Sequence, residues 1–291
     1  MRKFGVPGQS GLTNAPNLRG LTCEGAMRGL QLRIRTATRM LLAGLVFGAL
    51  LVPSAAMAHG QPADIVFFGP FGRPTLRCLH IMGRAARRCV SQVLSVQRAC
   101  LDRQLNGNSC DTAARDGQIN AAKQVGRDAV NSCLGGQLTE LRMIGFDEAK
   151  ADVARACDQG TAAATLAYTP GLTSPPAAAP IRQCVARTAE LSQKFLNFAV
   201  RHKSHMLDRM AGRAFLPSQK FRMMDAMHQR MASPQADLVA ALAQACPDFA
   251  TLYGDTAAAV LTSVQHLGDC VVGSTYVQTA ITCPPTPTPV P

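Results

Sequence analysis

The sequence predicts an all-α fold made of two tandem antiparallel helical-hairpin modules, stapled by disulfides and carrying short extra helices. Three observations predict it. Apolar residues recur at helical spacing, alternation with period two is almost absent, and the cysteine spacing repeats along the chain. Of the 291 residues, 47% are hydrophobic and 16% are charged. This composition is typical of a folded protein and differs from that of a disordered chain.

The first element is an N-terminal segment, residues 1–58, with the features of a secretory signal peptide. Four arginines between residues 28 and 39 precede an uncharged run from Met40 to Ala58, which ends in Ala-Met-Ala. We expect cleavage near Ala58 and export to the periplasm or the cell exterior. The alternative is an uncleaved anchor, because a run of this length can just span a bilayer.

Cysteine usage agrees with export. Removal of residues 1–58 deletes Cys23 and leaves ten cysteines, an even number. Such a set in an oxidising compartment indicates a disulfide framework. Zinc is the competing interpretation, but the sequence contains no Cys-x-x-Cys pair.

An internal duplication organises the rest of the chain. Cys133 and Cys157 are 24 positions apart, and so are Cys246 and Cys270. Aligning Cys78 with Cys184 also brings the Leu-Asp-Arg run that follows Cys100 onto the one that follows Met206. We expect a first helical module over 59–168, a Pro/Ala-rich linker over 169–180, a second module over 181–283 and a Pro/Thr tail over 284–291.

Each module is expected to begin with a long helix that folds back on a second one. Apolar residues recur at steps of three and four from Cys78 to Cys100 and from Cys184 to Met206. Turn-forming residues follow at 106–108 and 212–218, so the second helices should return antiparallel. Shorter helices should follow, with Asp147 and Asp255 as N-caps. Pro234 is expected to break the second helix of the second module.

Hairpin geometry predicts specific disulfides. Facing residues of an antiparallel hairpin have a nearly constant sum of residue numbers, because both helices rise equally per residue. The pairs Cys78/Cys133 and Cys100/Cys110 fit one register. Assigning the remaining cysteines by elimination, we expect five bridges: Cys78–Cys133, Cys89–Cys157, Cys100–Cys110, Cys184–Cys246 and Cys270–Cys283.

A cluster of histidine and methionine in the second module is the one candidate metal site. By the same register, His202 should face His228 and Met206 should face Met223 near the hairpin tip, with His205 beside them. Imidazole and thioether ligands suit copper, with methionine favouring the cuprous form. Haem held by His and Met is a second option. The simpler interpretation is that the methionines only fill the hydrophobic core near the hairpin tip.

Charge and composition limit the classes of partner that the protein can be expected to bind. The net charge is +12, but residues 59–291 carry 23 basic against 17 acidic residues. With no Trp and three Tyr, base-stacking surfaces are scarce, so no nucleic-acid partner is expected. The basic clusters 84–88 and 201–209 are interpreted as solvated helix faces, with peripheral contact to an anionic envelope surface as the alternative. The sequence does not indicate an oligomeric state.

The leading hypothesis is an exported, non-enzymatic, disulfide-rich helical protein that acts as a binding or cell-envelope structural module. The first alternative is a periplasmic copper- or haem-binding protein that uses the His/Met cluster. The second is an enzyme of unknown type. It has no positive support, because the sequence shows no known nucleophile, metal-protease, phosphate-loop or dinucleotide motif.

Overall fold

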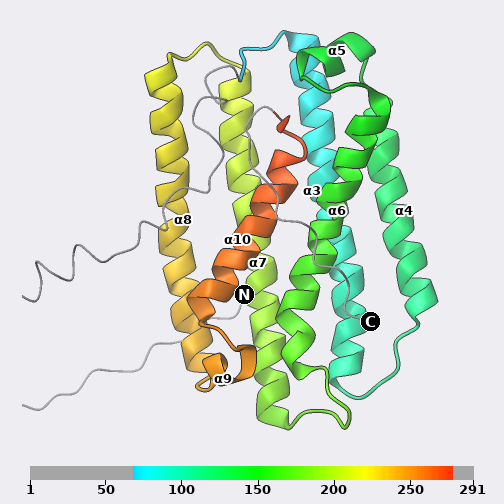
Figure 1. Ribbon diagram of the computed structural model, residues 1–291, viewed down its shortest axis with the longest axis vertical. Helices are drawn as coiled ribbons and strands as arrows, with labels where there is room; N and C mark the ends of the chain where they lie inside the picture. Colours follow the sequence, from blue (N-terminus) through cyan, green and yellow to red (C-terminus); the bar gives the residue numbers. More distant parts are fainter. Residues whose placement is uncertain (1–67, 278–291) are drawn as a thin grey trace, which may run out of the picture. The chain divides into compact units, whose positions relative to one another are not determined.

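Helices make up the regular structure of the chain. The computed structural model describes residues 68–277, and this range contains eight α-helices, one 3-10 turn and no strand (Figure 1). The all-α prediction is confirmed, while the signal segment and the tail lie outside the described residues. In chain order the elements are α3 (Arg73–Leu105), α4 (Thr112–Val130), α5 (Gly135–Glu140), α6 (Phe146–Tyr168), η1 (Thr169–Gly171), α7 (Ala179–Ala211), α8 (Pro217–Ala245), α9 (Phe249–Tyr253) and α10 (Ala257–Gly273).

Local sequence explains where the helices begin and end. Proline lies in the first turn of α3, α7 and α8, where its missing N–H has no helical partner in any case. Helix α4 begins after Asp111, whose side chain accepts a hydrogen bond from Ala114 N at 2.9 Å. Helix α3 ends before Gly107, whose φ of +77° favours glycine. Among residues 68–277, no helix combines the length and apolarity needed to cross a membrane.

Two predicted N-caps are wrong by one or two residues. Helix α6 is capped by Gly145, and Asp147 lies inside the first turn, where its charge complements the helix dipole. Helix α10 is capped by Thr256, whose hydroxyl accepts from Ala259 N at 3.2 Å. Asp255 instead accepts from Thr256 N at 2.7 Å, so its carboxylate is already used before the helix starts.

The predicted break at Pro234 is also wrong, because α8 continues through it from Pro217 to Ala245. A proline inside a helix removes the hydrogen bond to the carbonyl four residues earlier. That carbonyl belongs to Arg230, which is exposed, so water can replace the lost partner.

The helices divide into an inner and an outer set. In α3, α6, α7 and α10 roughly half of the residues are buried, whereas α4 and α8 each bury only four. In Figure 1, α4 and α8 accordingly lie at opposite edges of the bundle. The outer helices are amphipathic covers, and the inner four carry the core.

One buried core runs through both halves of the chain. It includes Leu79 and Val153 from the first half and Leu196 and Leu261 from the second. The long helices α3 and α7 lie antiparallel, since Phe71 N, just before α3, donates to Ala211 O at the end of α7 at 2.9 Å. Near its other end, Arg98 of α3 donates to the side chain of Gln193 in α7. The first helices of the two halves therefore take part in the junction between them, together with α6 and α10.

Four of the five predicted disulfides are present. Cys78–Cys133 and Cys100–Cys110 join α3 to the segments that flank α4, with Cα–Cα distances of 5.1 and 5.3 Å. Cys89–Cys157 joins α3 to α6, and Cys184–Cys246 joins α7 to the end of α8, at 5.3 and 5.1 Å. The fifth pairing involves Cys283, which lies outside the described residues. Each half is thus stapled within itself.

Candidate functional site

The predicted His/Met residues lie on the pair of helices α7 and α8. On α7, Met206 is buried, His202 is half-buried and His205 is exposed. On α8, Met223 and His228 are both half-buried. The structure thus separates His205, which points to solvent, from His202 and Met206, which lie one helical turn apart on the packed side. The predicted metal site itself stays a prediction.

His202 has an unusual environment for a half-buried imidazole. Its ring is stacked on that of Phe198, with centroids 5.8 Å apart and planes at 4°. Its Nε2 atom is buried, and no hydrogen-bond partner for it lies within the part of the chain that the structure describes. Burial lowers the pKa of His202, and the positive charges of Arg230, His205 and Lys203 lower it further. The neutral form of the imidazole is therefore favoured.

Methionines are frequent among the buried residues of α7 and α8. Met206, Met210, Met227 and Met231 are buried, and Met223 and Met224 are half-buried. Within residues 68–277, no group of three or more His, Cys, Asp or Glu side chains comes close enough to hold a metal ion. Any ion bound here would consequently depend on thioether sulfur as well as imidazole, which is a soft donor set.

A buried ion pair beside this region was missed by the sequence analysis. Lys203 of α7 is completely buried and forms an ion pair with Asp269 of α10. The sequence predicted that Lys203 belongs to a solvated basic cluster, and this prediction is wrong because the side chain is buried. The signal was present in the helical spacing, because Lys203 lies four residues from both Ala199 and Leu207 on the apolar stripe.

Two tyrosine–aspartate hydrogen bonds were also missed. Tyr168 at the end of α6 donates to Asp102 of α3, and Tyr276 after α10 donates to Asp208 of α7 at 2.6 Å. Burial is the main cause that raises the pKa of both tyrosines, and the aspartates add to it. The aspartates belong to the two matched Leu-Asp-Arg runs. The repeat therefore identified the two aspartates as equivalent positions, but it did not indicate that tyrosines would bind them.

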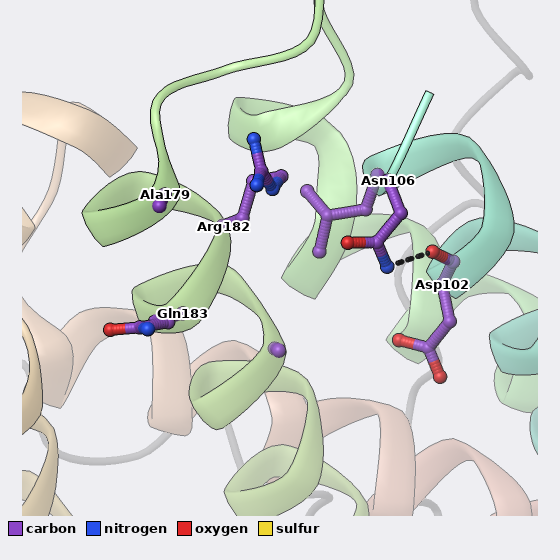
Figure 2. Close-up of a pocket in the computed structure, with 7 residues that line it drawn as sticks. Asp102, Asn106, Ala179, Arg182 and Gln183 are labelled. Carbon is purple, nitrogen blue, oxygen red and sulfur yellow. Dashed lines mark hydrogen bonds between the residues drawn. The ribbon is translucent and has the colours of Figure 1, made fainter. Parts of the chain in front are cut away.

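A pocket lies where α3 ends and α7 begins (Figure 2). Its volume is ≈ 260 Å³. Arg182 donates to Ala177 O at 2.6 Å, and the Asn106 side chain donates to Asp102 O at 2.8 Å, so the polar groups of the wall bond to one another. This arrangement offers a polar recess rather than an activated nucleophile or a proton-transfer pair. The lining residues are Asp102, Leu105, Asn106, Ala179, Arg182, Gln183 and Ala186.

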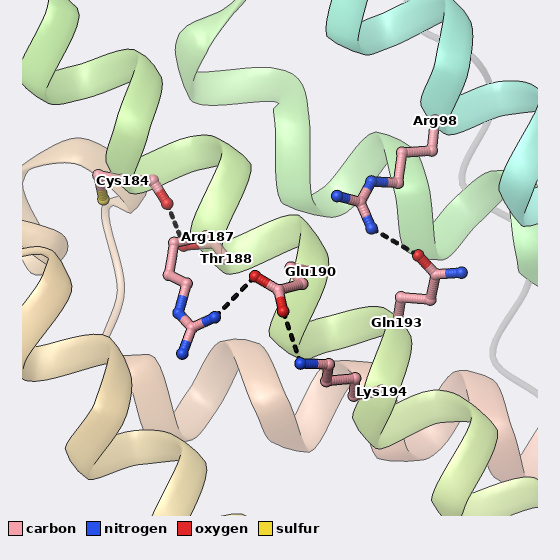
Figure 3. Close-up of polar contacts among 7 residues, drawn as sticks. All are labelled: Arg98, Cys184, Arg187, Thr188, Glu190, Gln193 and Lys194. Atoms are coloured by element: carbon pink, nitrogen blue, oxygen red, sulfur yellow. Dashed lines mark hydrogen bonds and ion pairs between the residues drawn. The ribbon is translucent and has the colours of Figure 1, made fainter. Parts of the chain in front are cut away.

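Polar contacts on the outer face of α7 are a surface network (Figure 3). Glu190 accepts from Lys194 at 2.5 Å and from Arg187 at 2.6 Å. Hydrogen bonds from Lys194 and Arg187 lower the pKa of Glu190 to about 2. Because these side chains are substantially exposed, we interpret the network as surface ion pairs that stabilise helix α7 and not as a binding site.

Comparison with known proteins gives no assignment. No family model, no curated protein sequence and no solved structure matches this chain.

Proposed function

We propose that this chain is an exported, disulfide-stabilised helical protein that serves as a binding or cell-envelope structural module. The observation that carries the proposal is a set of four disulfides, three within the first half and one within the second. Disulfides of this kind persist in oxidising compartments and are rare in cytosolic proteins. The basic and apolar N-terminal segment, residues 1–58, supports the same route.

The buried polar groups support a structural and binding role over catalysis. The Tyr168–Asp102, Tyr276–Asp208 and Lys203–Asp269 pairs each link the first helix of a half to the last segment of the same half. Buried groups that satisfy one another in this way fix helix packing. Equivalent links in the two halves are what a duplicated module would show. The two copies would be residues 59–168 and 181–283, joined by the linker 169–180.

The mass of the chain after expression in a bacterial host tests export and oxidation together. We expect the chain in the periplasm or medium, shortened by residues 1–58, and gaining one hydrogen per cysteine on reduction. A matched control is Leu45→Arg, which interrupts the apolar run and should retain the full-length chain in the cytosol. A full-length cytosolic protein with free thiols would contradict the proposal.

The second candidate is cuprous copper binding between α7 and α8, and one observation favours it. His202 has a buried Nε2 that nothing described satisfies, and its lowered pKa favours the neutral imidazole that binds metals. Met206 lies one helical turn away on α7, and thioether sulfur suits Cu(I). We propose His202 and His228 with Met206 and Met223 as the ligands, and the haem option would use the same side chains.

Titration of the purified, oxidised protein with Cu(I) against a colorimetric chelator tests this second candidate. We expect one Cu(I) per chain, with a loss of at least tenfold in affinity for His202→Ala. His205→Ala is the matched control, because His205 is exposed on the same helix and should change little. Equal affinities for the two variants would eliminate the site, and an absorption spectrum with added haem tests the other option.

A further inference from the structure

One end of the helical bundle is strongly basic. Three elements meet there: the start of α3, the end of α7 and the start of α8, at the upper end in Figure 1. Backbone and side-chain hydrogen bonds hold them together, since Phe71 N donates to Ala211 O at 2.9 Å and Lys220 Nζ donates to Phe68 O at 2.8 Å. Residues 68–77 and 209–222, far apart in the sequence, thus form one surface, which we call the basic end.

The basic end carries positive charge without acidic residues of its own. Its two segments contain no Asp or Glu. Lys220 is buried, but the five arginines are exposed, and none of them forms an ion pair with a carboxylate among residues 68–277. The five are Arg73, Arg77, Arg209, Arg213 and Arg222.

Fewer carboxylates than exposed arginines lie at or near this end. Glu140 accepts hydrogen bonds from Gly72 N at 3.4 Å and from the Thr75 hydroxyl. Asp208 accepts from Tyr276 and lies 3.4 Å from His80 Nε2. Asp225 is exposed on α8 and lies beyond the segment. The arginine charge is therefore only partly offset.

The opposite end of the same two helices is a built-in comparison. There the end of α3 meets the start of α7, and the corresponding segments are 103–116 and 174–183. They contain three arginines and two aspartates, and Arg115 is paired with Asp116 at 2.8 Å. An equivalent helix junction thus folds with a charge near zero. The excess arginines of the basic end are not needed for packing.

An exposed apolar tip lies within the basic end. Leu216, between α7 and α8, is 66% exposed, and Phe215 beside it is half-buried. The N-termini of α3 and α8 also point to this end, so their two positive helix-dipole ends outweigh the one negative end that the C-terminus of α7 contributes. Apolar side chains ringed by arginine are suited to the boundary between phosphate headgroups and acyl chains.

From this geometry we propose that the basic end docks on the surface of an anionic phospholipid bilayer. The arginines contact lipid phosphates, and Leu216 inserts at the headgroup boundary. Arginine suits this role because its planar guanidinium donates two parallel hydrogen bonds to phosphate. The inference goes beyond the proposed function by naming the partner, and it applies to the folded protein whether or not the cell exports it.

Co-sedimentation with lipid vesicles tests the proposal. The oxidised protein is mixed with vesicles of phosphatidylcholine, either alone or with phosphatidylglycerol added at about 30% to give the negative surface potential of natural anionic leaflets. We expect binding to the anionic vesicles only, weakening as salt rises from low to physiological concentration. Equal binding to neutral vesicles, or none to either, would overturn the proposal.

Charge variants at the two ends provide the matched control. Each arginine near an anionic surface strengthens binding by about fivefold, so R77Q/R213Q/R222Q should weaken it by about a hundredfold. R103Q/R115Q/R182Q removes the same charge from the opposite end and should weaken it by less than tenfold. Leu216→Ser should weaken binding to vesicles but not to soluble inorganic polyphosphate. Equal losses in the two triple variants, or binding to polyphosphate without binding to vesicles, would overturn the proposal.

Discussion

The two halves of the chain, α3 to α6 and α7 to α10, have similar helix arrangements. Different side chains stabilise the two arrangements. Each begins with a helix of 33 residues and contains a long-range disulfide, Cys78–Cys133 or Cys184–Cys246. The first half adds two further disulfides to its first helix. At the matching positions in α7, the second half has the buried side chains Phe195 and Met206.

The second half also contains the buried Lys203–Asp269 ion pair, whereas Gln97 is at the position in α3 that matches Lys203. One half therefore depends more on covalent links, and the other depends more on packing and electrostatics. The two halves share the helix arrangement rather than any one stabilising device. Four perturbations test this contrast.

The largest expected effect is at the buried ion pair. Asp269→Ala leaves the Lys203 ammonium buried without its partner, and we expect a loss of about 3–5 kcal/mol in the free energy of unfolding. Lys203→Met/Asp269→Ala should recover most of it, because no buried charge remains. Gln97→Met, the matched change in the first half, should be nearly neutral. Urea unfolding of the oxidised variants measures all three, and a loss below about 1 kcal/mol for Asp269→Ala would show that the pair is not buried.

The second prediction compares the contributions of two disulfides to the free energy of unfolding. Cys184 and Cys246 are separated by 62 positions, so Cys184→Ser/Cys246→Ser should lower the free energy of unfolding by about 4 kcal/mol. Cys100 and Cys110 are separated by only 10, and their removal should cost about 2.5 kcal/mol. Guanidinium unfolding of both variants gives the order. A larger loss for the short loop would contradict the dependence of disulfide stabilisation on loop length.

The third effect tests the equivalence of the tyrosine–aspartate links. Tyr168→Phe and Tyr276→Phe each remove a part-buried hydrogen bond to a carboxylate, and each should cost about 2 kcal/mol. Thermal unfolding monitored by circular dichroism is sufficient to compare them. Losses that differ by more than about 1.5 kcal/mol would mean that the two links are not equivalent. Tyr253→Phe, which removes a bond to a backbone carbonyl, is a useful reference.

The smallest effect is a pH dependence on the surface of α7. The pKa of Glu190 is about 2 in the folded protein, below its ordinary value of 4.5. The unfolded state therefore takes up its proton first as the pH falls, and the stabilisation is lost between about pH 4.5 and pH 2. Glu190→Gln should lower the melting temperature slightly at about pH 6 and not at about pH 2. A pH-independent difference would exclude this ion-pair network as the cause.

The sequence was sufficient to predict the secondary structure class and the pairing of eight cysteines. The helical seam from Cys78 to Cys100 defines the face, and the hairpin register defines the partner for three of the four pairs. The fourth, Cys89–Cys157, followed only by elimination. The close packing of one helix on another could not be predicted from such a local pattern. The close approach of α6 to α3 at Gly160, where an added Cβ would lie 2.7 Å from Val90 O, depends on tertiary contacts.

The candidate sites were predicted less completely than the fold. His202 and Met206 were placed on the packed face of α7 by spacing, whereas His205, which the sequence placed beside them, is exposed. Lys203 was misassigned because its charge was given more weight than its position on the apolar stripe. The basic end could not have been found from sequence, since its two segments come together only through the antiparallel packing of α3 and α7.

Disulfide mapping of the exported, unreduced protein by proteolysis and mass spectrometry decides whether the two helical halves are stapled separately. We predict that every linked peptide pair comes from a single half: Cys78–Cys133, Cys89–Cys157, Cys100–Cys110, Cys184–Cys246 and, beyond the described residues, Cys270–Cys283. A linked pair that joins residues 68–168 to residues 181–283, or a set of unlinked peptides, would contradict this arrangement.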